Sequence, residues 1–191
     1  MCSSDLNAKP GQNPLIVFAI EDKSGKPLDA KKTTRLRLYV AGPAADYTSQ
    51  YYDNVANADG NGYGVYWWTM SRPLPADAKG TWTAALEGRN TVILLEGTTK
   101  QVSVNDTGRN VQMAFSVDGS EVAPRRTVVS MAKCNACHGD LTFHGGGRNT
   151  IEQCVLCHNP TAADRDGKSI DMGVMVHKIH RGAALDRGFR I

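Results

Sequence analysis

The sequence predicts a mainly β N-terminal domain, either a sandwich or a split Greek-key barrel, followed by a mostly irregular segment with short helices. Short runs of β-branched and aromatic residues recur through the N-terminal part and are separated by clusters of Gly, Asn, Asp and Pro. Strands and turns at such spacing are typical of sandwiches and small barrels. The strand pattern stops after Val117, where the composition becomes polar and poor in core-forming residues.

Individual strands follow from local patterns. An apolar run at 15–20 predicts one strand, and the polar–apolar alternation at 35–40 predicts a half-buried strand. Further strands are expected at 63–69, 81–87, 99–104 and 111–117. Turn residues lie at 23–27, 59–62, 87–90 and 105–108. We therefore expect a disordered start at 1–11, a β domain at 12–122 and a second unit at 123–191.

Composition excludes several classes of function. The formal net charge of +3 is too small to indicate a nucleic-acid partner, and no apolar run approaches the roughly 20 residues of a membrane span. Met1 is followed at once by polar residues, so no signal sequence is expected in this chain. Cys2 fits two readings equally, the lipidated start of a bacterial lipoprotein and a truncated gene end.

Histidines and cysteines are concentrated in the C-terminal part. All five histidines lie at or after His138, and apart from Cys2 the cysteines lie between Cys134 and Cys157. Chemistry that uses imidazole or thiol groups is therefore expected only in this part of the chain.

Two copies of the pattern C-x-x-C-H carry this chemistry, at 134–138 and 154–158. This is the attachment motif of c-type haem. Two thiols one short turn apart can each form a thioether with one vinyl group of the same porphyrin, and the adjacent histidine then faces the iron. We expect covalent haem at Cys134 and Cys137, and a second haem at Cys154 and Cys157. The axial ligands on the motif side are His138 and His158.

A zinc site is the alternative, because the spacing of the two pairs also fits C-x2-C-x15–20-C-x2-C. Four cysteines would complete such a site without a histidine directly after each pair. The two histidines therefore favour haem over zinc or a redox dithiol.

Three histidines remain as second axial ligands, His144, His177 and His180. His144 precedes three glycines, whose missing side chains would let backbone lie close to a porphyrin face. His177 and His180 would share one face of a short helix. Two irons need only two of the three, and we expect the spare to be His177 or His180, with its haem motif lying beyond Ile191. The chain is then a fragment of a longer multihaem protein.

Other residues near the motifs have supporting roles. Two haems would supply the apolar core that this segment lacks. Basic side chains could pair with haem propionates or form a solvated surface: Arg125, Arg126, Arg148, Lys178 and Arg181. Met172 and Met175 are expected to pack against a haem edge.

The order of motifs over 134–182 resembles the OmcA/MtrC family of outer-membrane decahaem c-type cytochromes. The resemblance rests on both C-x-x-C-H motifs, on Phe143-His144-Gly145-Gly146-Gly147-Arg148 and on Met175-Val176-His177-Lys178-Ile179-His180. The strand-rich part that ends at Pro124-Arg125-Arg126 is similar to that family's N-terminal β domain.

The resemblance implies bis-histidine haems that act as a wire at the surface of a Gram-negative cell, with a lipid anchor as one possible attachment. Such proteins deliver respiratory electrons to extracellular acceptors, namely iron and manganese oxides or flavins. Their partners are other haem domains or cytochromes, including a porin–cytochrome complex in the outer membrane. This chain would hold the first β domain and the opening of the first haem domain.

We therefore expect an electron carrier, or a component of a terminal metal reductase, more than a classical enzyme. One rival is a haem reductase or peroxidase with an open distal site. A second is a binding role, as a zinc module with a β docking domain, for which Tyr51, Tyr52, Trp67 and Trp68 could form the docking face.

Overall fold

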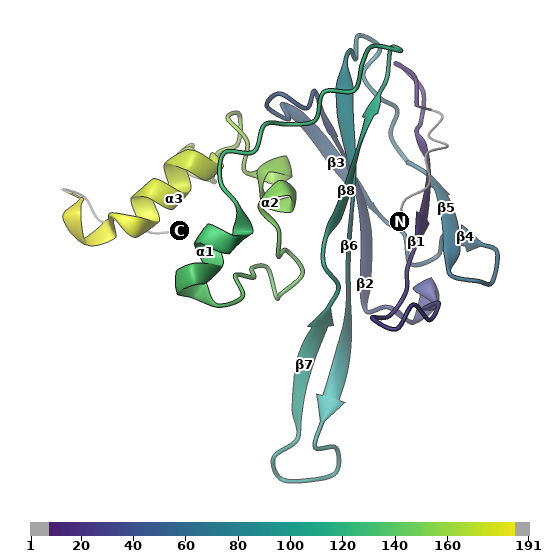
Figure 1. Ribbon diagram of the computed structural model, residues 1–191, viewed down its shortest axis with the longest axis vertical. Coiled ribbons are helices and arrows are strands. Elements are labelled where there is room, and N and C mark those ends of the chain that lie inside the picture. The colour runs from purple at the N-terminus through teal and green to yellow at the C-terminus, as the bar shows by residue number, and fades with distance from the viewer. Residues whose placement is uncertain (1–7, 186–191) are drawn as a thin grey trace.

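The computed structural model describes residues 8–185, and Figure 1 shows strands in the N-terminal part followed by three short helices. The strands are β1 (Leu15–Ala19), β2 (Arg35–Gly42), β3 (Ser49–Asn54), β4 (Asp59–Gly60), β5 (Val65–Thr69), β6 (Thr81–Leu94), β7 (Val102–Thr107) and β8 (Val111–Ser116). The helices are α1 (Met131–His138), α2 (Ile151–Cys157) and α3 (Met172–His180). Short 3-10 turns lie at Ala30–Lys32 and Gly182–Ala184. The expected class, a β-rich part followed by short helices, is confirmed.

The strands form two antiparallel sheets. The smaller has the order β1-β5-β4, and the larger has the order β3-β2-β6-β7, with β8 also paired to β6. Apolar side chains from both sheets share one core, including Phe18 of β1, Leu38 of β2 and Trp82 of β6, none more than 2% exposed. Two sheets that enclose one core make a sandwich, the first of the two predicted options.

The larger sheet is covered on its other face as well. Along β2, Leu38 and Val40 point into the sandwich core, whereas Tyr39 and Ala41 face the opposite side. There they form a second core with the buried side of α2, contributed by Ile151, Val155 and Leu156. The strand predicted at 35–40 is therefore present, but it is not half-buried as expected. The C-terminal segment covers its polar face.

Strand β6 is longer than predicted and runs through the turn expected at 87–90. It pairs with β2 along one edge, and with β8 and then β7 along the other. Gly88 serves close packing here, because a Cβ at this position would lie 3.1 Å from Leu36 Cδ1. The chain reverses after β6 instead, where Leu95 and Gly97 have φ angles of 52° and 76°.

Two other strand predictions need correction. Strand β7 extends to Thr107, so most of the turn expected at 105–108 is strand paired with β6. Strands β3 and β4 were not predicted, because β3 is a polar edge strand held by β2 and β4 is only two residues long. In each case cross-strand pairing overrides the local preference of Asn and Asp for turns.

Residues 8–11, part of the start expected to be disordered at 1–11, have defined contacts. Ala8 is buried, and the Gly11 amide donates to the Leu74 carbonyl at 3.1 Å. Cys2 lies outside the described residues.

The three helices differ in how they meet the sandwich. Helix α2 buries four residues, whereas α1 and α3 bury none. Figure 1 shows α2 nearest the strands, with α1 and α3 farther out. Among the described residues, no helix has the length and apolar character needed to cross a membrane.

Candidate haem-binding sites

Both C-x-x-C-H motifs lie on helices, which fixes the direction of their side chains. Helix α1 carries Cys134, Cys137 and His138, and α2 carries Cys154 and Cys157, with the following histidine as its C-cap. Positions i, i+3 and i+4 share one face of an α-helix. Each helix therefore presents two thiols and one imidazole on the same side, as attachment of one porphyrin requires.

The first motif histidine faces a histidine from α3. The rings of His138 and His180 have centroids 6.1 Å apart and an interplanar angle of 77°. Helix α3 is started by Asp171, whose carboxylate accepts from the amides of Gly173 and Val174 at 3.0 and 3.2 Å. This cap fixes where α3 begins and hence where His180 lies.

The second motif histidine faces a histidine from the loop between α1 and α2. The rings of His144 and His158 have centroids 6.3 Å apart and an interplanar angle of 28°. Helix α2 is started by Thr150, whose hydroxyl accepts from the Gln153 amide at 3.2 Å.

Both ring distances suit two imidazoles on opposite sides of one metal ion. With metal–nitrogen bonds of about 2.0–2.1 Å and about 1.1 Å from nitrogen to ring centre, two such centroids lie about 6.3 Å apart. The protein thus leaves a gap of the right width for a haem iron in each pair. Exposed apolar side chains near the histidines would meet the porphyrin, among them Phe143, Val174 and Ile179.

Backbone carbonyls fix the tautomer of three histidines. The Nδ1 atoms of His158, His177 and His180 lie 2.7–2.8 Å from the carbonyl oxygens of Ile170, Gly173 and Val176, respectively. A carbonyl can only accept, so each Nδ1 carries the proton and each Nε2 keeps a free lone pair. This is the usual arrangement behind a metal-bound imidazole.

His177 belongs to neither ring pair. It lies exposed on α3, one turn before His180, and within residues 8–185 its hydrogen bond is made by Nδ1. The structure therefore brings four of the five predicted histidines together as pairs and leaves His177 apart from them.

One of the four motif thiols differs in exposure. Cys137 is exposed, whereas Cys134, Cys154 and Cys157 are half-buried. Burial raises the pKa of Cys154 to about 11 and also raises the pKa of Cys157. Among residues 8–185, no group of three or more His, Cys, Asp or Glu side chains is placed to hold a metal ion directly. A four-cysteine zinc cluster is thus not formed by the described residues.

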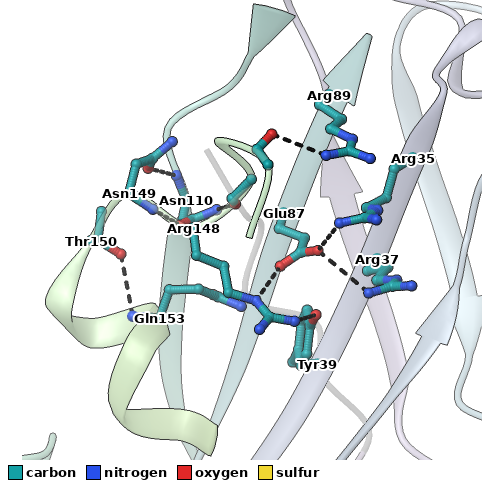
Figure 2. A network of polar contacts seen from close by, with 12 residues as sticks. Arg35, Arg37, Tyr39, Glu87, Arg89, Asn110, Arg148, Asn149, Thr150 and Gln153 are labelled. Carbon is teal, nitrogen blue, oxygen red and sulfur yellow. Dashed lines mark hydrogen bonds and ion pairs between the residues drawn. The ribbon is translucent and has the colours of Figure 1, made fainter. Parts of the chain in front are cut away.

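A buried ion-pair network joins the second site to the sandwich (Figure 2). Glu87 of β6 is 1% exposed and lies 3.2 Å from Arg148 Nε, 3.7 Å from Arg35 and 3.8 Å from Arg37. Arg148 also donates to the Tyr39 hydroxyl at 3.1 Å. Burial opposes the charge of Arg148, but Tyr39 and Glu87 outweigh it and raise its pKa.

Two asparagines form a second connection. The backbone amides of Asn110 and Asn149 each donate to the side-chain oxygen of the other residue, at 3.0 and 2.8 Å. The Asn110 side chain also donates to the Gly147 carbonyl, and Arg109 donates to the Asn149 carbonyl. Figure 2 shows Asn110 and Asn149 together beside α2, where Gln153 lies buried. The loop that carries His144 is thereby fixed to the β7–β8 connection.

The three glycines after His144 pack against strands, whereas the sequence suggested that they serve a porphyrin face. A Cβ at Gly145 would lie 2.3 Å from an Arg89 nitrogen, and one at Gly146 would lie 3.1 Å from Thr107 Cγ2. The pKa of His144 is lowered by desolvation and then by the positive charge of Arg148.

The basic residues named as propionate partners are partly engaged within the protein. Arg126 forms an ion pair with Asp46 at 3.5 Å, and Arg125 lies over the Tyr47 ring at 5.9 Å. Arg148 binds Glu87 as described, and Arg181 is the exposed C-cap of α3.

The aromatic residues proposed as a docking face do not share one surface. Tyr51 is 8% exposed and Trp68 packs against the sandwich core, donating from Nε1 to Asp53 at 2.8 Å. Tyr52 and Trp67 are exposed but lie on different sheets. A shallow depression of about 510 Å³ beside Tyr51 contains none of the predicted site residues.

Sequence reasoning missed the strand residues that support the second site. These residues are Arg35, Arg37, Tyr39, Glu87, Arg89, Asn105 and Asn110. One pattern in the sequence could have indicated them. Arginines and a tyrosine alternate with leucines at 35–40, and a strand face of this kind needs an acidic or polar partner when it is covered. The acidic partner in another strand gave no comparable signal.

Comparison with known proteins finds a similarity in the C-terminal part of the chain. Residues 126–189 match the family described as outer membrane cytochrome MtrC/MtrF-like, domains II/IV. This range contains both motifs and all five histidines. The matched family is the one that the order of motifs over 134–182 resembles. A curated relative, the multiheme cytochrome MtrC of Shewanella baltica (strain OS185), is 30% identical over 125 residues. The match covers 64% of this chain, which corresponds to 19% of the relative, so the chain spans about a fifth of that protein.

Proposed function

We propose that this chain binds two c-type haems and transfers electrons between them. One haem is attached at Cys134 and Cys137, and the other at Cys154 and Cys157. The observation that carries the proposal is the pair of ring distances, 6.1 and 6.3 Å, between a histidine of each motif and a second histidine.

Each residue has a defined part in this proposal. His138 and His180 hold one iron, and His144 and His158 hold the other. The carbonyls of Ile170 and Val176 keep Nε2 of His158 and His180 unprotonated and directed to the metal. Haem bound at each site supplies an iron that cycles between the ferric and ferrous states.

Occupation of both axial positions supports a carrier more than an open-site enzyme. With an imidazole on each face, no coordination position is left for a peroxide or another small substrate. The ligands also need not exchange when the iron changes oxidation state, which favours rapid electron transfer.

The two sites are close along the chain, which supports transfer between them. His138 of one site and His144 of the other are joined by the loop 139–143. Since a chain spans at most about 3.5 Å per residue, their Cα atoms lie within about 21 Å of each other.

The wider role follows from the family. We propose that the chain is part of a multihaem conduit at the cell surface, which passes respiratory electrons to extracellular metal oxides or flavins. Other haem domains or cytochromes, including a porin–cytochrome complex, would be its partners. His177 would then serve a further haem attached outside these residues, because it is exposed on α3 and belongs to neither ring pair.

Maturation in a periplasm with haem-attachment machinery tests the proposal. Mass spectrometry should show two covalent haem additions, and the pyridine haemochrome spectrum should be that of c-type haem. Both ferric irons should be low-spin. Recovery of zinc without covalent haem, or a high-spin wild-type chain, would contradict the proposal.

A further inference from the structure

His144 has an unusual backbone conformation for a ligand-bearing residue. Its φ angle is 55°, and Gly145 and Gly146 follow with φ angles of 74° and 81°. Residues with a Cβ seldom adopt this left-handed region, because the Cβ approaches backbone oxygen. Such a conformation persists only where the surroundings enforce it.

The strands supply that enforcement immediately after His144. The Gly145 carbonyl accepts two hydrogen bonds, from Arg89 of β6 at 3.0 Å and from Asn105 of β7 at 2.9 Å. These two donors come from neighbouring strands and reach the same oxygen. They therefore fix the Gly145–Gly146 peptide, one residue after His144, from the side of the sandwich.

The hydrogen bond from Arg89 requires a glycine at position 145. A Cβ at Gly145 would lie 2.3 Å from the Arg89 nitrogen that makes the bond. The glycine and the two donors thus fit each other, and the same glycine permits the left-handed turn that directs His144. Farther along the loop, Asn110 holds the Gly147 carbonyl at 2.9 Å.

We propose that Arg89 and Asn105 are positioning residues for the second haem, holding His144 in place opposite His158. The β part is then a component of one haem site and not only a neighbouring domain. This inference rests on the proposed function, because it concerns the axial ligand of a haem that function requires. The other pair lies on α1 and α3, which bury no residue. The hydrogen bonds from Arg89 and Asn105 to Gly145 should therefore affect one haem alone.

The test uses the matured two-haem chain with Arg89→Ala and Asn105→Ala combined. Carbon monoxide binds a bis-histidine ferrous haem only after one imidazole leaves. Each lost hydrogen bond should raise the ligand-off population about fivefold, the factor for one typical net bond. The rate of carbon monoxide binding should therefore rise about 25-fold at one of the two haems. Replacement by Arg89→Lys and Asn105→Gln keeps donors at both positions and should restore most of the wild-type rate.

Two comparisons assign the effect. Asn90→Ala is the matched control, because Asn90 lies on the same strand and accepts from the Thr34 amide at 3.0 Å without touching the loop. A chain with Cys134→Ala and Cys137→Ala would carry only the second haem, and the accelerated reaction should remain in it. Asn105 is exposed, so the single Asn105→Ala variant should mature normally and show about a fivefold increase.

The possible results separate the two proposals. A wild-type chain that lacks low-spin haem contradicts the proposed function before any variant is made. If the wild type is low-spin and the folded double variant binds carbon monoxide at the wild-type rate, the positioning role is wrong. An equal increase in the carbon monoxide binding rate at both haems, or an equal increase in Asn90→Ala, would also overturn it. Either result indicates a general destabilisation of the fold.

Discussion

The two histidine pairs start from the same motif but are supported differently. His138 and His180 lie on α1 and α3, and both imidazoles are exposed. His158 caps α2, which buries four residues, and His144 lies on a loop held by the strands. The first pair therefore lies on helices that are only partly buried against the second core, and the other on a buried helix and a loop bonded to the strands.

This difference shows that a motif fixes the geometry of its own helix but not how that helix packs against the rest of the protein. Both motifs place two thiols and an imidazole on one helix face. The second is preceded by buried residues that bond to the β part, Arg148 with Glu87 and Asn149 with Asn110. The first is followed by Asp140, whose ion pair with Arg109 is exposed. The following predictions test how far the two sites are independent.

Removal of axial histidines should have the largest effect. In the matured chain, His180→Ala should convert the first haem to a high-spin form, and His144→Ala should do the same only to the second, because each loses its opposing imidazole. His177→Ala is the matched control and should leave both low-spin. Electron paramagnetic resonance and cyanide binding would measure this. A high-spin signal in His177→Ala would show that the pairing is wrong.

Truncation of apolar side chains should have the second largest effect, and this effect should differ between α2 and α3. Leu156 is fully buried between α2 and the larger sheet, so Leu156→Ala in the haem-free chain should lower the free energy of unfolding by about 2–5 kcal/mol. Val174 on α3 is 40% exposed, and Val174→Ala should change it by less than about 0.5 kcal/mol. Urea denaturation followed by circular dichroism measures both, and equal effects would contradict the comparison.

Thiol reactivity in the haem-free chain should also differ between the motifs. Burial raises the pKa of Cys154 from the ordinary 9.0 to about 11, and a shift of two units leaves about a hundredfold less thiolate near neutral pH. Exposed Cys137 should therefore react with iodoacetamide well before Cys154. Peptide mass spectrometry over time measures the order. Equal rates would mean that α2 is not packed against the sandwich.

The ring angles predict the subtlest difference, in the shape of the low-spin resonance signals. The imidazole planes are 28° apart in the His144–His158 pair and 77° apart in the His138–His180 pair. Nearly parallel axial rings separate the iron d orbitals more than nearly perpendicular ones. We expect a rhombic signal from the second haem and a strongly anisotropic, large-g signal from the first. Chains that lack one motif's thiols would assign each signal, and two identical spectra would contradict the ring geometry.

The predicted strands show where local patterns suffice and where they do not. The apolar run at 15–20 and the run at 111–117 each form a strand within a residue or so of the expected bounds, because their side chains fit a shared core. The turn expected at 87–90 instead lies within β6, since Gly88 is paired with β2 and Asn90 with β7, which holds both extended. Glycine and asparagine signal a turn only where no neighbouring strand competes for their backbone.

The sequence by itself determined the chemistry of the site. Two C-x-x-C-H motifs place thiols and imidazole on one helix face wherever the helices lie, because helical spacing alone sets that geometry. Three further histidines supplied candidates for the opposing ligand, but their spacing could not distinguish among them. Only the tertiary structure paired His180 with His138 and His144 with His158. It also decided that Arg89, Asn105 and Glu87, far away in the sequence, support one site and not the other. Such contacts depend on strand register and on which face of the sheet the later segment covers, and neither is encoded in a local pattern.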